Sequence, residues 1–448
     1  MKKLLFSTAA AVSLMAETTE LETLKTQMVH MQQTLQSMHE KINALESSNA
    51  QETPPSEILP LTGPNNGTLS NLDFSLILDT SYVNRSQKEE RLSALNTPGF
   101  VKSPLSESPY NPSNGFNLNY AEVALHSVVD PYLDADVVFH VAEGGVEIEE
   151  GYLTSRNLPY NLRIRGGKLL SEFGRINAQH HHAWNFSDLP LVYRSFLGHE
   201  KLKENGVQFQ WIAPTEPYLM FGIEALQGSN YASFGTTPIT NSYDGSTLAS
   251  SPAKPSLIVG YAKTSMDIAE STLLAGASVV RGESRIDFAD SDPAFSGKST
   301  LYGVDFTLKH YFDSYSSLSW QSEWLYRTME GRQFSDNGSA LLDELSGRKQ
   351  AGFYTELVYA PDQTWRFGTR YDSIYHNALS VEGVDRHLPG SMEQISAMIE
   401  YHTSEFARYR FEYAHSNALF TTAGERQPLD SFIFSVNLAI GKHTAHSF

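Results

Sequence analysis

The chain has 448 residues, no cysteine and a formal net charge of −18 at pH 7. This acidic balance argues against a general nucleic-acid-binding protein, because phosphate contacts need clustered lysine and arginine in excess. The absence of cysteine fits export through an oxidising compartment and fits a cytosolic protein equally well. Aromatic residues make up 11% of the chain, a content that soluble enzymes share with outer-membrane barrels.

Residues 1–16 are predicted to form a signal peptide. Lys2 and Lys3 precede an apolar run from Leu4 to Ala16, which suits the core of a signal peptide and is too short to cross a bilayer as a helix. We expect cleavage after Ala16. Later segments lack the run of about 18 apolar residues that a transmembrane helix needs.

Residues 17–52 are predicted to form a helical coiled coil in the periplasm. Apolar side chains recur at alternating spacings of three and four, at Leu21, Leu24, Met28, Met31, Leu35, Met38, Ile42 and Leu45. A stripe this narrow favours a second helix beside it, whereas a helix docked on its own domain usually has a wider one. We therefore expect self-association, interpreted as a homotrimer. A polar linker over residues 53–71 follows, because Pro54 and Pro55 end the helix.

From residue 72 to 448 the sequence predicts β-strands, since apolar and polar side chains alternate. Tyr409 and Phe411 share one face, for example, while Arg408 and Arg410 share the other, so one face suits lipid and the other water. About 16 such segments are joined mostly by alternating short turns and long loops, as in outer-membrane barrels. We expect an all-β transmembrane antiparallel β-barrel of about 16 strands after the α-helical segment. A secreted array of β-sandwiches is the alternative.

The segment Gln179–His199 is the third long loop on this count, and it is rich in histidine, aromatic and carboxylate side chains. Its apolar content is too high for a mobile surface loop. We expect it to fold into the lumen and to set the width and chemistry of the pore. The candidate constriction residues of the loop are Trp184, Asp188, Tyr193 and Arg194.

The loop also offers candidate metal ligands. Without cysteine, zinc needs histidine and carboxylate ligands. His180 and His182 point the same way in an extended segment, and His181, Asp188 or His199 could complete a site for a transiently bound Zn²⁺. The alternative is that the imidazoles hydrogen-bond to carboxylates of the wall and pin the loop in the lumen. The candidate wall carboxylates are Glu149, Asp134 and Asp136.

Arginine side chains on the predicted strands form a second candidate selectivity element. Basic rows along the lumen would suit an anion-conducting pore. The candidates are Arg163, Arg165, Arg366, Arg370, Arg408 and Arg410. The alternative is that these side chains pair across neighbouring strands with acidic residues. Their candidate partners are Asp372, Glu412, Glu356 and Glu323.

Four stretches carry a resemblance to a known family, namely 167–177, 179–184, 188–198 and 441–448. They resemble bacterial outer-membrane proteins often labelled zinc-regulated TonB-dependent outer-membrane receptor, and the barrel plan resembles the phosphate-selective porins. The first label implies a plug domain of well over a hundred residues before a barrel of about 22 strands. Only about 55 residues separate the expected cleavage site from the first strand, so we expect a porin-like channel without TonB coupling.

The sequence predicts a non-enzymatic protein, because it lacks a Gly-x-Ser-x-Gly elbow, a His-Glu-x-x-His pair and a phosphate-binding glycine loop. The expected function is passive uptake of small hydrophilic solutes or ions through the Gram-negative outer membrane. One alternative is a specific zinc uptake receptor, and another is a structural protein that tethers the membrane to the cell wall. The expected partners are outer-membrane lipid and lipopolysaccharide, further copies of the chain, and a small solute or metal ion.

Overall fold

The computed structural model describes residues 72–441, apart from 104, 143–144, 287–292, 337 and 339. The segments expected to form the signal peptide (1–16), the coiled coil (17–52) and the linker (53–71) lie outside the described residues. So do residues 442–448. The chain divides into two units, Met1–Gly67 and Thr68–Phe448, and the fold below is that of the second unit.

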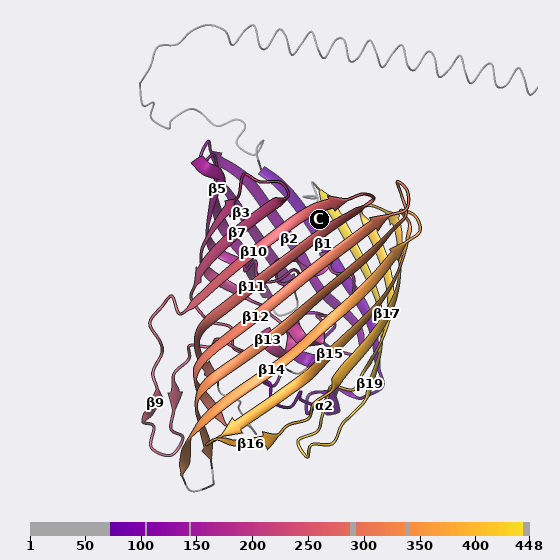
Figure 1. The fold of residues 1–448 in the computed structure, drawn as a ribbon. Helices are drawn as coiled ribbons and strands as arrows, with labels where there is room; N and C mark the ends of the chain where they lie inside the picture. The colour runs from indigo at the N-terminus through magenta and orange to yellow at the C-terminus, as the bar shows by residue number, and fades with distance from the viewer. Residues whose placement is uncertain are drawn as a thin grey trace, which may run out of the picture. The chain divides into compact units, whose positions relative to one another are not determined.

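The described strands form a closed antiparallel barrel (Figure 1). The ring closes because β1 pairs with both β2 and β19. Its sixteen strands are β1 (Leu72–Arg85), β2 (Gly115–Asp130), β3 (Leu133–Ala142), β4 (Gly145–Ser155), β5 (Leu162–Leu170), β6 (Lys203–Ile212), β7 (Tyr218–Leu226), β10 (Leu257–Ile268), β11 (Ser271–Ile286), β12 (Ala294–Tyr311), β13 (Ser317–Asp336), β14 (Leu341–Ala360), β15 (Trp365–Val381), β17 (Met392–Ser404), β18 (Ala407–Ser416) and β19 (Leu429–Gly441). The predicted antiparallel β-barrel and its number of strands are confirmed, whereas the helical segment expected before it lies outside the described residues.

Smaller elements lie in the connections between these strands. β16 pairs with the end of β15, and β8 pairs with β9 in a separate hairpin. The short strands are β8 (Ile239–Thr240), β9 (Thr247–Ala249) and β16 (Val384–His387). The helices are α2 (Glu89–Leu92), α3 (Leu191–Leu197), η1 (Leu105–Glu107), η2 (Pro159–Asn161), η3 (Ile176–Ala178) and η4 (His181–Ala183). No helix in the described ranges is long and apolar enough to span a membrane.

The period-two pattern places aromatic side chains outside the barrel and charged side chains inside it. On β15, Trp365 and Phe367 are 40% and 42% exposed, whereas Arg370 and Asp372 are 1% and 0% exposed. Successive side chains of a strand face opposite sides of the sheet, so this contrast follows from the sequence alternation. An apolar exterior with a polar interior is the arrangement of a barrel in lipid.

The two ends of the barrel differ in their connections. Short turns join β2 to β3, β6 to β7, β10 to β11 and β17 to β18 at one end, here called the turn end. The long connections gather at the other, here called the loop end, where β13 and β14 extend to 20 residues each (Figure 1). Three long loops are used below: L1 (86–114), L3 (171–202) and L4 (227–256).

These loops fold into the lumen and occupy part of it. Side chains from L1, L3 and L4 form one buried apolar cluster with the inner face of the wall. Its loop members are Phe100, Tyr110, Phe173, Ile176, Trp184, Leu189, Leu191, Val192, Tyr193, Phe196, Leu197, Leu202 and Phe234. The apolar side chains of L3 therefore pack inside their own barrel, as expected from the sequence. The contributions of L1 and L4 were not predicted.

The architecture implied by the TonB-dependent receptor label is wrong for the described residues. A receptor of that class has about 22 strands around a separate plug domain. Here sixteen strands form the ring, and the barrel's own loops occupy the lumen. In the described residues, loops and wall share the largest buried apolar cluster.

Candidate functional site

L3 enters the lumen through a set of contacts with Glu323 on β13. The carboxylate accepts hydrogen bonds from the backbone N–H groups of Arg175 and Ile176 at 2.8 and 2.9 Å, and from the Tyr193 hydroxyl at 2.7 Å. Gly174 has a φ of +64°, and a Cβ there would strike both Tyr193 and Glu323. Glycine is therefore required where the loop turns inward.

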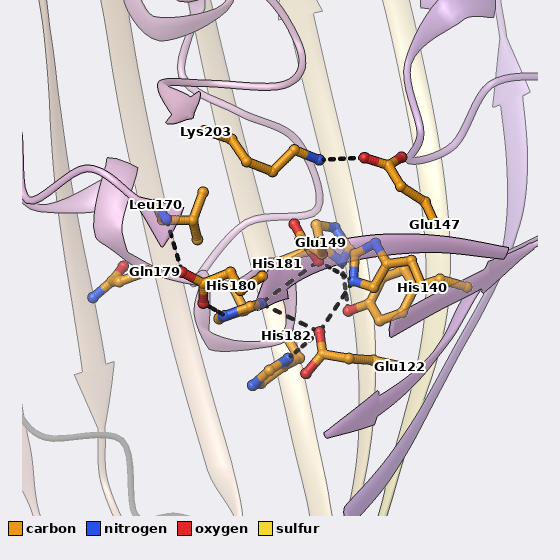
Figure 2. Close-up of polar contacts among 12 residues, drawn as sticks. Glu122, His140, Glu147, Glu149, Leu170, Gln179, His180, His181, His182 and Lys203 are labelled. Atoms are coloured by element: carbon orange, nitrogen blue, oxygen red, sulfur yellow. Dashed lines mark hydrogen bonds and ion pairs between the residues drawn. The ribbon is translucent and has the colours of Figure 1, made fainter. Parts of the chain in front are cut away.

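The first half of L3, here called the histidine half (Gln179–Ser187), lies against strands β2, β3 and β4. Three imidazoles converge on one oxygen of Glu122, a side chain that is 3% exposed. Glu122 Oε2 lies 3.1 Å from His140 Nε2, 3.4 Å from His180 Nδ1 and 3.5 Å from His182 Nδ1 (Figure 2). Burial disfavours a charged His180 imidazole, but the facing carboxylates outweigh burial and hold its pKa well above the usual value.

Two successive glutamates of β4 both face this cluster because of a β-bulge. Val138 pairs with Glu150 and Phe139 pairs with Ile148, so Glu149 is the extra residue. Regular alternation would place only one of two neighbours in the lumen, and the bulge re-aims the second. Glu149 contacts His140 and lies 3.7 Å from His180 Nδ1, while Glu150 Oε2 lies 2.9 Å from His180 Nε2.

His181 takes no part in this cluster. Its ring stacks on Tyr110 at 3.9 Å, its Nδ1 lies 3.1 Å from the Tyr120 hydroxyl, and its Nε2 lies 3.3 Å from the Ser187 carbonyl oxygen. A carbonyl can only accept, so we assign the proton to Nε2 and let Nδ1 accept from Tyr120. Burial lowers the His181 pKa to about 4, and the imidazole is neutral.

The second half of L3, here called the helix half (Asp188–His199), is fixed by ion pairs and by apolar packing. Arg370 of β15 contacts Asp188 at 2.5 Å and Asp372 at 2.9 Å. Asp372 also accepts a hydrogen bond from the Leu191 N–H at 2.8 Å, where a carboxylate satisfies a free donor of the first turn of α3. Every residue of α3 is buried.

The structure does not unite the five metal ligands predicted from L3. His180 and His182 do face the same way, with stacked rings 5.7 Å apart. His181 turns into the aromatic core, and Asp188 is engaged by Arg370. His199 and Asp188 line a small cavity of about 40 Å³ at the loop end instead.

Glu122 and His140 of this cluster were not among the site residues predicted from the sequence. Glu122 and His140 are cross-strand neighbours in the register of β2 and β3. Both side chains face the lumen on their strands. The pairing register of β2 and β3, had it been known, would have placed Glu122 opposite His140. Of the predicted wall carboxylates, Glu149 does contact His180, whereas Asp134 pairs with Arg156 and Asp136 with His126.

The lumen arginines are paired or packed. Arg370 contacts the predicted partner Asp372, but on its own strand β15. Arg366, Arg408 and Arg410 do pair across neighbouring strands, all with Glu400 of β17, which was not among the predicted partners. The other proposed partners, Glu412, Glu356 and Glu323, accept hydrogen bonds from L3 instead. Arg163 donates to Gln210, Arg165 lies over the Tyr152 ring, and Arg194 lies 3.8 Å from Asp188.

A cavity of about 580 Å³ lies between L3 and the turn end. Gln179, His182, Trp184 and Asn185 of the histidine half line one side of it. The cations of its lining are Arg175, Lys309, Arg366 and Arg408, and its carboxylates are Glu356 and Asp362. The cavity, here called the vestibule, therefore carries an excess of positive charge.

Comparisons with known proteins give one sequence relative and several distant structures. No protein-family model matches the chain. A protein of Aquifex aeolicus (strain VF5), described as uncharacterized, is 39% identical over 381 residues, which cover 84% of this chain and 80% of that protein.

Among solved structures, the outer membrane channel DcaP of Acinetobacter baumannii is 12% identical with a TM-score of 0.49, covering 83% of this chain and 96% of that one. The anion-selective porin from Comamonas acidovorans is 10% identical with a TM-score of 0.46, covering 82% and 99%. OmpF of Salmonella typhi, in complex with daunomycin, is 11% identical with a TM-score of 0.45, covering 84% and 99%. Similarities this distant carry no functional assignment.

Proposed function

The chain belongs to the same family as the uncharacterized Aquifex aeolicus protein, and from its own geometry we propose that it is an outer-membrane channel for passive passage of small hydrophilic solutes or ions. The observation that supports this proposal is the position of L3. The loop crosses the lumen of a barrel with a polar inner wall and forms one side of the vestibule. A loop folded into a barrel lumen sets the width and chemistry of the path. L3 is the constriction in this proposal.

The proposed orientation places the turn end in the periplasm. Outer-membrane barrels have short periplasmic turns and longer extracellular loops, and the connections of this barrel differ in that way. The vestibule then opens toward the periplasm, and L1, L3 and L4 face the outside. Exposed aromatic side chains such as Trp365 and Phe411 would contact lipid.

The proposed selectivity is for small anions. The lining of the vestibule contains four cationic side chains and two carboxylates. An excess of one sign of charge concentrates ions of the opposite sign in a narrow path. The reversal potential of barrels in a planar bilayer under a salt gradient measures this preference. We expect an anion-selective potential that weakens in Arg366→Gln. A cation-selective potential would contradict the proposal.

The proposed passive mechanism predicts how flux depends on concentration. Purified barrels in liposomes should admit small solutes with a rate that rises linearly with the solute gradient. Saturation at low solute concentration would favour a specific receptor instead, and a complete lack of flux would favour a structural role.

We also propose that the mature chain self-associates as a homotrimer. The support is the narrow apolar stripe of residues 17–52, which favours a partner helix. Chemical cross-linking of the mature protein, with and without residues 17–52, tests this. We expect a cross-linked trimer for the chain that contains residues 17–52 and none for the chain that lacks them. A monomer in both proteins would contradict the proposal.

A further inference from the structure

The strongest unexplained feature of the lumen is the group of buried side chains where L3 meets the wall. Glu122, His140, Glu149 and His180 each offer one ligand atom, and these four atoms all lie within 4.8 Å of one another. Three come from the consecutive strands β2, β3 and β4, and the fourth comes from L3 (Figure 2).

We propose that Glu122, His140, Glu149 and His180 form a four-coordinate site for a divalent transition metal, with Zn²⁺ as its natural probe, and that the metal fastens L3 to the barrel wall. The site does not rest on the proposed channel activity, because its test measures binding and loop exchange rather than conduction. It also differs from the set predicted in L3, with which it shares only His180.

The spacing of the donor atoms fits tetrahedral coordination. Ligand atoms at the usual zinc distances of about 2.0–2.1 Å lie about 3.3 Å from one another in a tetrahedron. Glu122 Oε2 lies 3.1 Å from His140 Nε2 and 3.4 Å from His180 Nδ1. Glu149 Oε2 lies 3.7 Å from His180 Nδ1. The contact between Glu149 and His140 is shorter and would widen around an ion. The other two separations, Glu122 to Glu149 and His140 to His180, are within 4.8 Å.

Two of the donor atoms are buried and meet no partner in good hydrogen-bond geometry, although both contact other members of the cluster. They are His180 Nδ1 and Glu149 Oε2, whose only close polar neighbours among the described residues are the other members of the cluster. Glu149 is 4% exposed. A buried polar atom without a hydrogen bond is costly, and coordination to a metal would satisfy both atoms.

The charge of the cluster also suits a divalent ion. Two buried carboxylates need compensating positive charge. Without a metal the imidazoles supply it by protonation, and a divalent ion that binds their ring nitrogens displaces those protons and supplies the charge instead. Two carboxylates, two neutral imidazoles and one divalent cation sum to zero. Nitrogen and oxygen ligands of this mixture favour zinc and its neighbours in the first transition row, whereas calcium and magnesium prefer oxygen ligands throughout.

A carboxylate supports the histidine from L3. His180 Nε2 lies 2.9 Å from Glu150 Oε2, and Glu150 in turn accepts a hydrogen bond from the Leu170 N–H at 2.7 Å. Metal-binding histidines usually donate their second ring N–H to a carboxylate in this way, which leaves the other nitrogen free for the metal. The same bulge that turns Glu149 inward supplies this partner.

A cavity on the side of the turn end borders two of the four proposed ligands, Glu122 and His180. This cavity of about 180 Å³ is also lined by Glu150 and His182. Asp73 and Asp136 add carboxylates to its lining. Such a lining favours a cation over an anion, in contrast to the positively charged vestibule.

The first experiment titrates ZnCl₂ into the refolded mature chain in detergent, after chelation, by calorimetry. We expect His180→Ala and Glu149→Gln each to weaken zinc binding by at least about 100-fold, more than the loss of a supporting partner. His415→Ala, which alters an exposed histidine of β18, should bind as the wild type does. Equal affinity in wild type and both variants would overturn the site.

Two further measurements keep the proposal testable if the variants fold poorly. X-ray absorption at the zinc edge of the wild-type protein should show two nitrogen and two oxygen ligands at about 2.0–2.1 Å, and a six-oxygen shell would overturn the assignment. Hydrogen exchange of residues 179–187 should slow at least tenfold when zinc binds. Unchanged exchange with zinc bound would overturn the fastening of L3.

Discussion

The two halves of L3 are attached to the barrel by different chemistry. The helix half encloses α3 among apolar side chains, and its Asp188 carboxylate is paired with Arg370 of β15, which also pairs with Asp372 on the same strand. The histidine half instead presents His180 and His182 to acidic side chains of the wall. Dense packing gives the helix half a fixed position that changes little with the solvent. The contacts of the histidine half join imidazoles to carboxylates and depend on their protonation, so this half is the adjustable part of L3.

The largest expected effect comes from the core of the helix half. Phe196 is fully buried, with Phe100 at 5.2 Å and the Arg327 guanidinium at 4.9 Å from its ring. Phe196→Ala should lower the free energy of local opening of α3 by about 3–5 kcal/mol, the usual cost of such a cavity. Hydrogen exchange of the α3 amides should accelerate by at least about 100-fold.

Phe411→Ala is the matched control for this change, because Phe411 is 48% exposed on the outer face of the barrel. It removes the same atoms without touching L3. The exchange rate of α3 should stay at the wild-type value in this variant. Equal acceleration in both variants would mean that α3 is not held by its own packing.

An intermediate effect on the histidine half is expected from a change at Glu150, the β4 side chain that faces His180. Glu150→Gln keeps the size of the side chain but removes the charge that faces His180 Nε2 at 2.9 Å. Zinc affinity should fall by about 10–100-fold, as for other supporting partners of metal ligands. Calorimetry measures the change. Glu147→Gln, at an exposed site that pairs with Lys168 and Lys203, should leave the affinity unchanged.

The smallest effect is expected at the first turn of α3. Asp372→Asn keeps an oxygen for the Leu191 N–H but removes the negative charge at the helix N-terminus. The stability of α3 should fall by about 1 kcal/mol, and its amide exchange should accelerate about fivefold. Asp362→Asn, in the turn before β15, is the control and should leave α3 unchanged. If Asp372→Asn lowers the stability of α3 as much as Phe196→Ala does, charge rather than apolar packing holds the helix half in place.

The strands could be predicted from the sequence because each one repeats the same physical constraint. Lipid on one side and water on the other enforce a period of two, as Trp365 and Arg366 or Tyr409 and Arg410 show. The entry of L3 into the lumen followed from its apolar content. Both inferences need only the chemistry of single residues and their spacing.

The details of the site depend on information that one sequence does not carry. Glu149 and Glu150 both face the lumen only because β4 has a bulge, and alternation alone would put one of them in lipid. The pairing of Glu122 with His140 depends on strand register. Arg410 pairs with Glu400 on the neighbouring strand rather than with Glu412 on its own, a choice set by side-chain geometry.

Single-channel conductance in planar bilayers tests the central claim most directly, namely that L3 is the constriction of a channel. The comparison is between the wild-type barrel and a variant in which residues 179–199 are replaced by a glycine-serine segment of equal length. We expect a small conductance for the wild type and a conductance at least several-fold higher for the variant. Equal conductance in the two proteins, or no conductance in either, would contradict this account.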